Sequence, residues 1–457
     1  PQVFASTFGR RPGYLGLRVL DSTHPDAVRD LRDSLDLPTT LFVVSSKSGT
    51  TLEPNSFFRF FWQALAPLTP SPGRHFVAIT DPGTPLERLA RDRGFRRCFL
   101  AHSDVGGRYS ALTDFGLLPA ALIGVDVRGV LDRAHRMAEA CAPVVGPAQN
   151  PGLRLGALLG ELALAGRDKV TFVTSPALDS FPAWAEQLIA ESTGKSGTGI
   201  VPVADEVRPL DPSLGPDRLV VYLRLKAESD PTREAELIEV ERAGTPIVRY
   251  DLADRLDIAQ EFFRWELGVA SAGAVLQIDP FDQPDVELAK QLARTAMESA
   301  SNLHATDSPE RVPVDDLPSL SEALGTWMGQ AHPSDYVAIQ AYLAPTASSV
   351  AGLRRVRTAL RGRLGLSTTL GFGPRFLHST GQLHKGGPPT GLFLQIVDRP
   401  TGDLDVPGAD YTFGQVIHAQ ALGDAAALRK KKRRLLTVDL GLSGEDGLER
   451  LVEAIHG

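Results

Sequence analysis

Short apolar runs alternate with amphipathic stretches along most of the chain, and this alternation is typical of a parallel β-sheet covered by helices. Leu41, Phe42, Val43 and Val44 form an apolar run of the kind found in strands that are buried on both faces. Strands are predicted over residues 15–20, 40–45, 75–80, 96–101, 169–174, 219–223, 246–250 and 392–397, and a strand followed by a helix over 435–455. Helices are predicted over residues 53–65, 85–93, 112–127, 183–190, 258–267, 285–297 and 350–364, and after Asp21-Ser22-Thr23. This pattern predicts the α/β fold class.

Changes in composition divide the chain into three parts. Residues 142–152 are rich in proline and glycine, and residues 301–320 are rich in Asp, Pro and Ser, so we expect a loop or boundary at each. We therefore expect one α/β unit over residues 1–145, a second over 150–300 and a mixed α/β region over 320–457.

Composition narrows the class of protein. The chain has 457 residues and a formal net charge of −7, and no apolar stretch approaches the ~18–20 residues that span a bilayer. Cys98 and Cys141 are too few for a disulfide framework or a zinc site, and the chain begins without a signal sequence. We expect a cytoplasmic protein that binds neither membranes nor nucleic acid, and we interpret the basic run over residues 429–434 as a solvated helix end.

A hydroxyl-rich segment, Ser46-Lys47-Ser48-Gly49-Thr50-Thr51, lies between a buried strand and a helix. Free N–H groups and the helix dipole favour an anion at this place, and hydroxyls can donate to phosphate oxygens. The alternative is an ordinary loop whose hydroxyl groups only cap the following helix. The sequence alone leaves both open.

Two further segments place charged residues beside glycines. Gly106 and Gly107 precede Arg108, as in a turn that presents a guanidinium to a ligand, although this segment by itself favours a surface turn whose Arg makes a structural ion pair. Glu191 stands at a predicted helix end before Gly194-Lys195-Ser196, where a carboxylate can act as a general base or be solvated. A nucleotide-binding P-loop is excluded because position 189 is Ile rather than Gly.

The segment over residues 375–389 contains His378, His384 and Lys385 among Gly, Pro and hydroxyl residues. A histidine that moves protons near neutral pH is the better functional interpretation, since no Cys or acidic cluster stands nearby to complete a metal site. A loop histidine bonded to backbone remains the alternative.

Together these segments resemble the glucose-6-phosphate isomerase (phosphoglucose isomerase) family, which is built from two sugar-isomerase (SIS) domains. The matching motifs are Ser46-Lys47-Ser48-Gly49-Thr50-Thr51, Gly106-Gly107-Arg108-Tyr109-Ser110, Gln187 with Glu191-Ser192-Thr193-Gly194-Lys195, Phe281-Asp282-Gln283-Pro284-Asp285-Val286 leading to Lys290, and Leu377-His378-Ser379-Thr380-Gly381-Gln382. Residues 376–387 and 390–395 look most like the isomerase part of bifunctional transaldolase/glucose-6-phosphate isomerases. The family pattern also has a Gly-Gly-Ser strand before the first loop, which would lie upstream of Pro1.

The resemblance implies two SIS domains with parallel sheets flanked by helices, and reversible isomerisation of glucose 6-phosphate and fructose 6-phosphate through an enediolate. It implies that Glu191 is the base, that Arg108 stabilises the enediolate, and that His378 and Lys290 move protons on the ring oxygen and O1. The substrate-binding residues that it implies are Ser46, Lys47, Ser48, Thr51, Gln187 and Gly107. It implies neither a metal nor a cofactor.

The resemblance also implies a homodimer in which the neighbouring subunit supplies the histidine, and a transaldolase domain is possible upstream in the intact protein. Two alternatives remain open. One is a non-catalytic SIS module that binds sugar phosphates, and the other is a related isomerase acting on mannose 6-phosphate.

Overall fold

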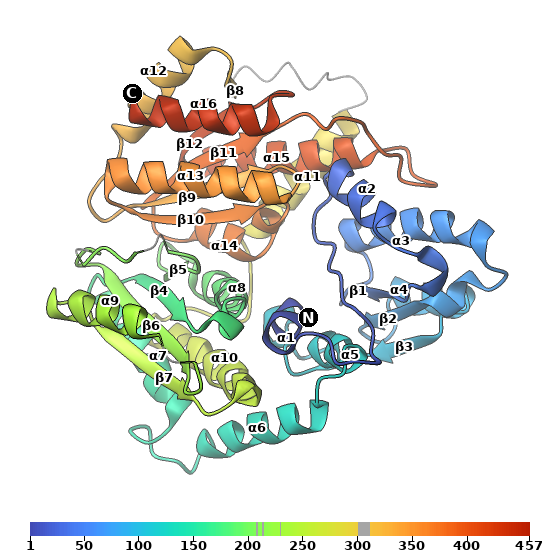
Figure 1. Ribbon diagram of the computed structural model, residues 1–457, viewed down its shortest axis with the longest axis horizontal. Helices are drawn as coiled ribbons and strands as arrows, with labels where there is room; N and C mark the ends of the chain where they lie inside the picture. The colour runs from blue at the N-terminus through green and yellow to red at the C-terminus, as the bar shows by residue number, and fades with distance from the viewer. Residues whose placement is uncertain (207–208, 213, 229, 300–310) are drawn as a thin grey trace.

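The structure is a computed structural model that describes residues 1–206, 209–212, 214–228, 230–299 and 311–457. Within these residues the chain forms three sheets in which all paired strands are parallel, and helices flank each sheet (Figure 1). The predicted α/β class is confirmed. We call the three sheets with their helices the first, second and third unit.

The first unit has the strand order β1-β2-β3. Its strands are β1 (Phe42–Ser45), β2 (Phe76–Thr80) and β3 (Arg97–Leu100), and its helices are α2 (Pro25–Asp33), α3 (Leu52–Leu65) and α4 (Pro85–Asp92). The aromatic face of α3 is core: Phe58, Phe60 and Phe61 are buried against β2 and its neighbours. Helix α3 begins immediately after the hydroxyl-rich loop that follows β1, so the packing of α3 also fixes the end of that loop.

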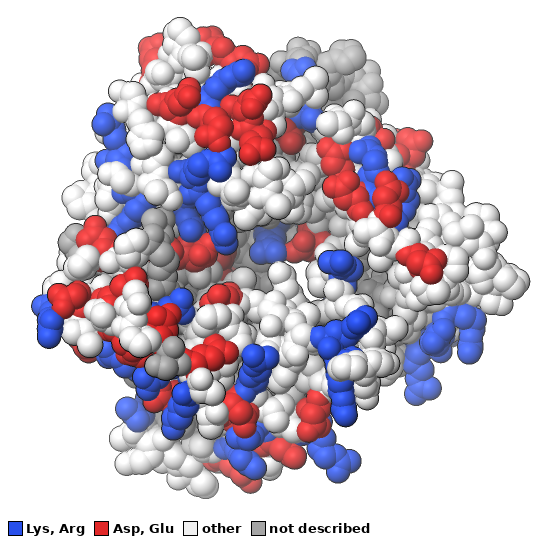
Figure 2. Space-filling model, in the orientation of Figure 1, with Lys and Arg blue, Asp and Glu red and all other residues white. Residues whose placement is uncertain are grey.

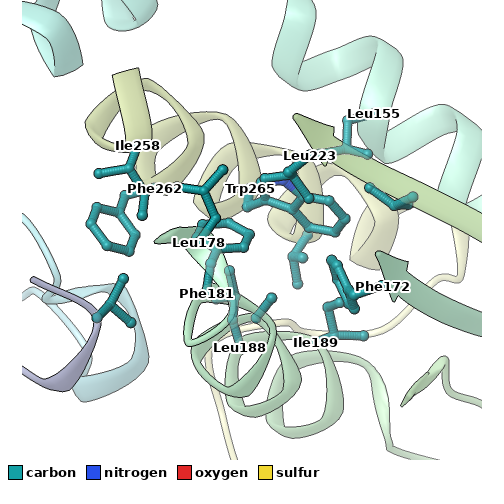
Figure 3. Close-up of a cluster of buried hydrophobic side chains, with 14 of the residues drawn as sticks. Leu155, Phe172, Leu178, Phe181, Leu188, Ile189, Leu223, Ile258, Phe262 and Trp265 are labelled. Atoms are coloured by element: carbon teal, nitrogen blue, oxygen red, sulfur yellow. The ribbon is translucent and has the colours of Figure 1, made fainter. Parts of the chain in front are cut away.

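The second unit has the strand order β5-β4-β6-β7. Its elements are α7 (Pro151–Leu164), β4 (Lys169–Thr174), α8 (Phe181–Thr193), β5 (Val201–Val203), β6 (Arg218–Leu225), α9 (Pro231–Arg242), β7 (Ile247–Leu252) and α10 (Ile258–Val275). Phe172, Phe181, Phe262 and Trp265 fill the space between the sheet, α8 and α10 (Figure 3). This packing fixes the position of α8.

Three helices connect the first and second units: α1 (Gln2–Phe8), α5 (Asp114–Leu122) and α6 (Val127–Ala140). Although α1 begins the chain, Phe4 packs in the core of the second unit, with its ring centroid 5.5 Å from that of Phe262. The chain then runs back past α5 to α2 in the first unit (Figure 1).

The third unit has the strand order β10-β9-β11-β12-β8. Its strands are β8 (Arg311–Pro313), β9 (Tyr336–Tyr342), β10 (Ser367–Phe372), β11 (Gly391–Val397) and β12 (Arg434–Asp439). Its helices are α11 (Val286–Ser299), α12 (Leu317–Met328), α13 (Ala347–Leu364), α14 (Ser379–Gly386), α15 (Phe413–Lys430) and α16 (Gly444–His456). Every residue of β9 and β11 is buried, as expected for the central strands of a parallel sheet covered on both faces.

Three sequence-based expectations need correction. Residues 15–20 form no strand: Leu15 N–H donates to Leu122 O at the end of α5 at 3.1 Å, Leu15 and Val19 are exposed, and Leu20 packs against the core of the first unit. Of the boundary expected over residues 301–320, residues 301–310 lie outside the described part, but β8 and the start of α12 occupy much of the remainder.

The basic run over residues 429–434 is only partly a solvated helix end. Lys430, Lys431 and Lys432 are exposed, but Arg434 forms a two-pronged ion pair with Asp335 at 2.6 and 2.9 Å. Arg433 donates to the backbone oxygens of Lys385 and Gly387. The end of the run therefore anchors β12 and α14. None of the helices in the described ranges is both long and apolar enough to cross a bilayer.

Candidate active site

Glu191 and Arg108 form a buried ion pair between the first and second units. Glu191 lies in the last turn of α8, and Arg108 lies in a short 3-10 helix, η4 (Gly107–Tyr109). Arg108 Nη1 donates to Glu191 Oε1 at 3.0 Å, and the two side chains are only 4% and 8% exposed. Because an ion pair is screened little where water is excluded, each charge acts strongly on the other and on any group placed between them.

The other donors of Arg108 fix the plane of its guanidinium. Nε donates to Ser192 Oγ at 2.9 Å, and Nη2 donates to the backbone oxygens of Pro280 and Asp282 at 2.5 and 2.9 Å. Lys195 donates to Asp282 O at 2.6 Å and forms an ion pair with the Asp282 carboxylate. Two cations therefore hold the segment that leads into α11.

Gln187 and Gly107 lie beside this pair. Gln187, one turn before Glu191 on α8, is exposed, and its Nε2 donates to Glu191 Oε2 at 3.5 Å. Gly107 begins η4, and its backbone oxygen accepts a hydrogen bond from Ser110 Oγ at 2.6 Å. Gln187 and Gly107 thus lie next to Glu191 and Arg108, and their roles in substrate binding stay predictions.

His378 lies against the first unit. It is the N-cap residue of α14, and its Nε2 is 3.5 Å from Oε1 of Glu53 in the first turn of α3. Burial alone raises the pKa of the Glu53 carboxyl, but the hydrogen bond and charge of His378, with the charge of Lys290, bring that pKa below its ordinary value. Lys290 on α11 also pairs with Glu287 at 2.6 Å. The structure thus gathers His378, Glu53 and the charge of Lys290 into a second group.

His384 has different surroundings. It is buried, its ring lies 5.7 Å from that of Phe376 and 5.0 Å from that of Phe393, and its Nδ1 is 3.1 Å from Gln340 Nε2. Burial and the nearby charges of Lys385 and Arg433 lower the pKa of His384 well below its ordinary value. A ring packed in this way is a core residue, so His378 is the better candidate for proton transfer.

The hydroxyl-rich loop closes on itself at the end of β1. Ser46 Oγ lies 2.9 Å from Thr51 Oγ1 and accepts a hydrogen bond from Gly49 N, while Ser48 Oγ lies 2.9 Å from Thr50 Oγ1. Gly49 has φ +66°, and a Cβ there would come within 2.7 Å of Leu86 N, so the turn requires glycine. The hydroxyls accordingly cluster just before the N-terminus of α3.

Lys47 points to the neighbouring strand ends rather than to the other loop hydroxyls. Its Nζ donates to Asp81 Oδ1 at 3.0 Å and to His102 O at 3.3 Å. To bind phosphate, Lys47 would have to share its charge with Asp81.

Gln382 ties the helices of the site together. Its Nε2 donates to Gly194 O and to Asp285 Oδ2, both at 2.9 Å, and its Oε1 accepts from Asp285 N at 2.9 Å. Gly194 ends α8 and Asp285 precedes α11, so one fully buried side chain on α14 links the helices that carry Glu191, Lys290 and His378. Figure 2 shows a hollow in the middle of the viewed face, where the three units meet, with basic and acidic side chains around it.

Glu53 is the residue that the sequence analysis missed. Its only local signal is its position two residues after Thr51, in the first turn of the helix that follows the hydroxyl loop. Within the described residues, no three His, Cys, Asp or Glu side chains are arranged to hold a metal ion.

Comparison with known proteins agrees with the motifs. A family model described as Phosphoglucose isomerase matches residues 5–203. A probable glucose-6-phosphate isomerase of Natronomonas pharaonis is 31% identical over 310 residues, which cover 60% of this chain and 72% of the relative. The chain belongs to the phosphoglucose isomerase family. The predicted class of enzyme, an aldose–ketose isomerase, is therefore confirmed.

Further relatives extend the match. A probable glucose-6-phosphate isomerase of Methanococcus maripaludis is 28% identical over 312 residues, covering 61% of this chain and 70% of that protein. The crystal structure of a glucose-6-phosphate isomerase from Chlamydia trachomatis has a TM-score of 0.55 at 22% identity, covering 66% of this chain and 68% of that chain. The likeness to the Chlamydia trachomatis structure supports the fold alone.

Proposed function

We propose that this chain interconverts glucose 6-phosphate and fructose 6-phosphate through an enediolate, with Glu191 as the base. The observation that carries the proposal is the buried Glu191–Arg108 pair, because a carboxylate beside a fixed guanidinium suits proton transfer next to a developing oxyanion. The names of the relatives support the same substrates.

Glu191 removes the proton from C2 of the open-chain aldose, and the electron pair of the broken bond forms the C1–C2 double bond. Arg108 stabilises the negative charge that develops on the enediolate oxygens. Glu191, now a carboxylic acid, returns the proton to C1, while the proton of the C2 hydroxyl passes from O2 to O1, and the ketose forms. One carboxylate serves both steps, and the reaction needs no oxidant or reductant.

Ring opening is assigned to His378, helped by Lys290. An imidazole can give a proton to the ring oxygen and take one from O1 near neutral pH. The hydroxyls of Ser46, Ser48 and Thr51, with Lys47, hold the phosphate at the N-terminus of α3, where the helix dipole favours an anion.

We propose that His378 acts within its own chain. The resemblance implied a histidine from a neighbouring subunit, but here His378 lies 3.5 Å from Glu53 of the same chain. The reason is the order of the units: the third unit follows α11 and places α14 against α8. A homodimer remains a proposal, but His378 does not require one.

We also retain three proposals that depend on the intact protein: a homodimer, a cytoplasmic location and an adjoining transaldolase domain. The likeness of residues 376–387 and 390–395 to bifunctional proteins is what supports the last of these. The mass of the natural gene product would decide it.

The test of the proposed function uses the purified chain with three substrates. Fructose 6-phosphate should give glucose 6-phosphate in a coupled assay, and the product formed in deuterium oxide should carry deuterium at C2. Mannose 6-phosphate should react far more slowly. Binding of all three sugars without turnover or deuterium uptake would instead indicate a non-catalytic SIS module.

A further inference from the structure

Helix α15 turns two buried polar side chains toward the segment that carries His378. Gln420 and Asp424 stand four residues apart, so they share one face of the helix. They are 2% and 0% exposed, and their neighbours Ile417 and Ala421 belong to an apolar core. Buried polar groups on such a face need a reason, because burial without partners is costly.

Gln420 connects two distant segments through hydrogen bonds of short length. Its Nε2 donates to Glu53 Oε1 at 2.7 Å, and its Oε1 accepts from Thr23 Oγ1 at 2.6 Å. An ionised carboxylate can only accept hydrogen bonds, so the amide must present its NH₂ to Glu53 and its oxygen to Thr23. The orientation of Gln420 is therefore determined.

We propose that Gln420 is a positioning residue: it holds the Glu53 carboxylate in the orientation that receives the imidazole of His378. The hydrogen bond from Gln420 and the ion-pair contact of His378 meet at the same oxygen, Oε1, which has lone pairs for both. Without Gln420 the carboxylate can turn about its last bond, and the imidazole loses its fixed partner. The inference rests on the proposed function, since it gives His378 a proton-transfer role.

Asp424 supports the segment that carries His378 by holding the backbone of that segment in place. Its carboxylate pairs with Lys385 Nζ at 2.5 Å, and Lys385 donates to the backbone oxygens of Phe376 and Gly381 at 2.7 and 3.4 Å. Phe376 and Gly381 lie on either side of His378. One face of α15 thus holds both parts of His378. Asp424 acts through Lys385 on the backbone around His378, and Gln420 acts through Glu53 on its imidazole ring.

Two charged or titratable groups lower the pKa of the Glu53 carboxyl: His378 at the start of α14 and Lys290 on α11. Loss of the Gln420 donor removes stabilisation of the ionised carboxylate, so Glu53 should take up a proton at a higher pH than before. The acid limb of the pH profile should then move to higher pH.

The test replaces Gln420 with Met, which keeps the length of the side chain and removes its hydrogen bonds. Gln420→Met should lower kcat between about 5-fold and 100-fold with little change in KM, since misplacing a reacting group can cost 10²-fold. The acid limb of kcat/KM should move to higher pH. The NMR signal of the His378 ring, assigned with His378→Asn, should shift as well.

Gln395→Met is the matched control. Gln395 is also 2% exposed, and its bonds go to Ala421 O of α15 and to Thr437, away from Glu53. This variant should lose stability but keep the pH profile and the His378 signal. Thr23→Val removes the hydrogen bond that Thr23 donates to Gln420, so the pH profile and the His378 signal should change in the same direction but by less. This variant replaces Gln420→Met in the test if Gln420→Met does not fold.

Two results would overturn the inference: a wild-type pH profile and His378 signal in Gln420→Met, or equal changes in Gln395→Met. Failure of the proposed function is distinct, because the unaltered chain would then show no turnover. The NMR comparison can be made in either case.

Discussion

Glu191 and Glu53 are both carboxylates at helix ends, but their cationic partners differ. Glu191 ends α8 and faces the guanidinium of Arg108, and both side chains are more than nine-tenths buried. Glu53 begins α3 and faces His378, which is 37% exposed. Arginine keeps its charge at any ordinary pH, whereas an imidazole gains and loses a proton near neutrality. One pair is therefore suited to stabilise a constant charge and the other to pass a proton.

The two pairs also differ in how their partners are fixed. Four donor contacts hold Arg108 to Glu191, Ser192 and the 280–282 backbone. His378 depends on Glu53, which in turn depends on Gln420. Both sites join three separate segments, but Arg108 is held by four direct donor contacts, whereas His378 is held through Glu53 and, behind it, Gln420.

The largest expected effect is the loss of kcat on changing Glu191, and comparing it with the loss on changing Glu53 distinguishes the roles of the two carboxylates. Glu191→Gln keeps the shape of the side chain but cannot accept a proton, so kcat should fall on the order of 10³-fold and deuterium uptake at C2 should stop. Glu53→Gln should cost less, because it disturbs the partner of His378 rather than the base. The coupled assay and deuterium exchange measure both; equal losses would show that the comparison is wrong.

Arg108→Lys should have the next largest effect. It keeps one positive charge but loses the planar fork that reaches Glu191, Ser192 and the backbone together, so kcat should fall about tenfold or more. KM should change less. A raised KM with normal kcat would instead make Arg108 a binding residue.

The hydroxyl loop should affect binding rather than proton transfer. Ser48→Ala with Thr51→Val removes two donors, and substrate binding should weaken by about 1–2 kcal/mol, with kcat nearly unchanged. Replacing the exposed residues Lys430 and Lys432 with Gln is the control, and it should change binding little. Similar losses from both sets, measured by calorimetry with fructose 6-phosphate, would contradict this assignment.

Local pattern was enough to predict most of the fold. The apolar runs at β4 and β11 were identified because each strand buries all of its residues, whereas β1, whose run predicted a strand buried on both faces, buries only Val44. The expected strand over residues 15–20 was wrong because Leu15 and Val19 are exposed and Leu15 bonds to the end of α5 rather than to a strand. β9 and α15 were missed, since buried Gln340 and Gln420 interrupt their apolar pattern, and β10 was missed because it begins with the buried polar residues Ser367 and Thr368.

The candidate site was predictable only in part. Glu191, Arg108 and the hydroxyl loop each stand in a local motif, and the structure joins Glu191 and Arg108 across 83 residues. Glu53 with His378 and Gln420 with Thr23 carry no local signal, because Thr23 and Gln420 are 397 residues apart and only the packing of α15 brings them together. Contacts of that separation depend on tertiary structure rather than on nearby sequence.

The last prediction concerns stability rather than activity, at another buried carboxylate, and it tests why the Glu191 pair needs several donors. Glu261 on α10 is 3% exposed, lies 3.3 Å from Arg264, and its Oε2 has no hydrogen-bond partner. Burial raises the pKa of Glu261 from 4.5 to about 7, despite the opposing charge of Arg264. The charge of Arg264 therefore does not bring the pKa of Glu261 back to its ordinary value, and the charge of Asp257 raises that pKa further.

Between pH 4.5 and 7 the folded chain holds the Glu261 proton more tightly than the unfolded chain does, so the free energy of unfolding falls as pH rises through this window. Glu261→Gln removes that dependence. Relative to the unaltered chain, the variant should be about equally stable at pH 5 and more stable at pH 8, by on the order of 1–3 kcal/mol. Thermal midpoints at the two pH values measure the difference, with Glu322→Gln on the exposed face of α12 as control. An equal gain at both pH values would mean that packing, rather than the buried charge, accounts for the change.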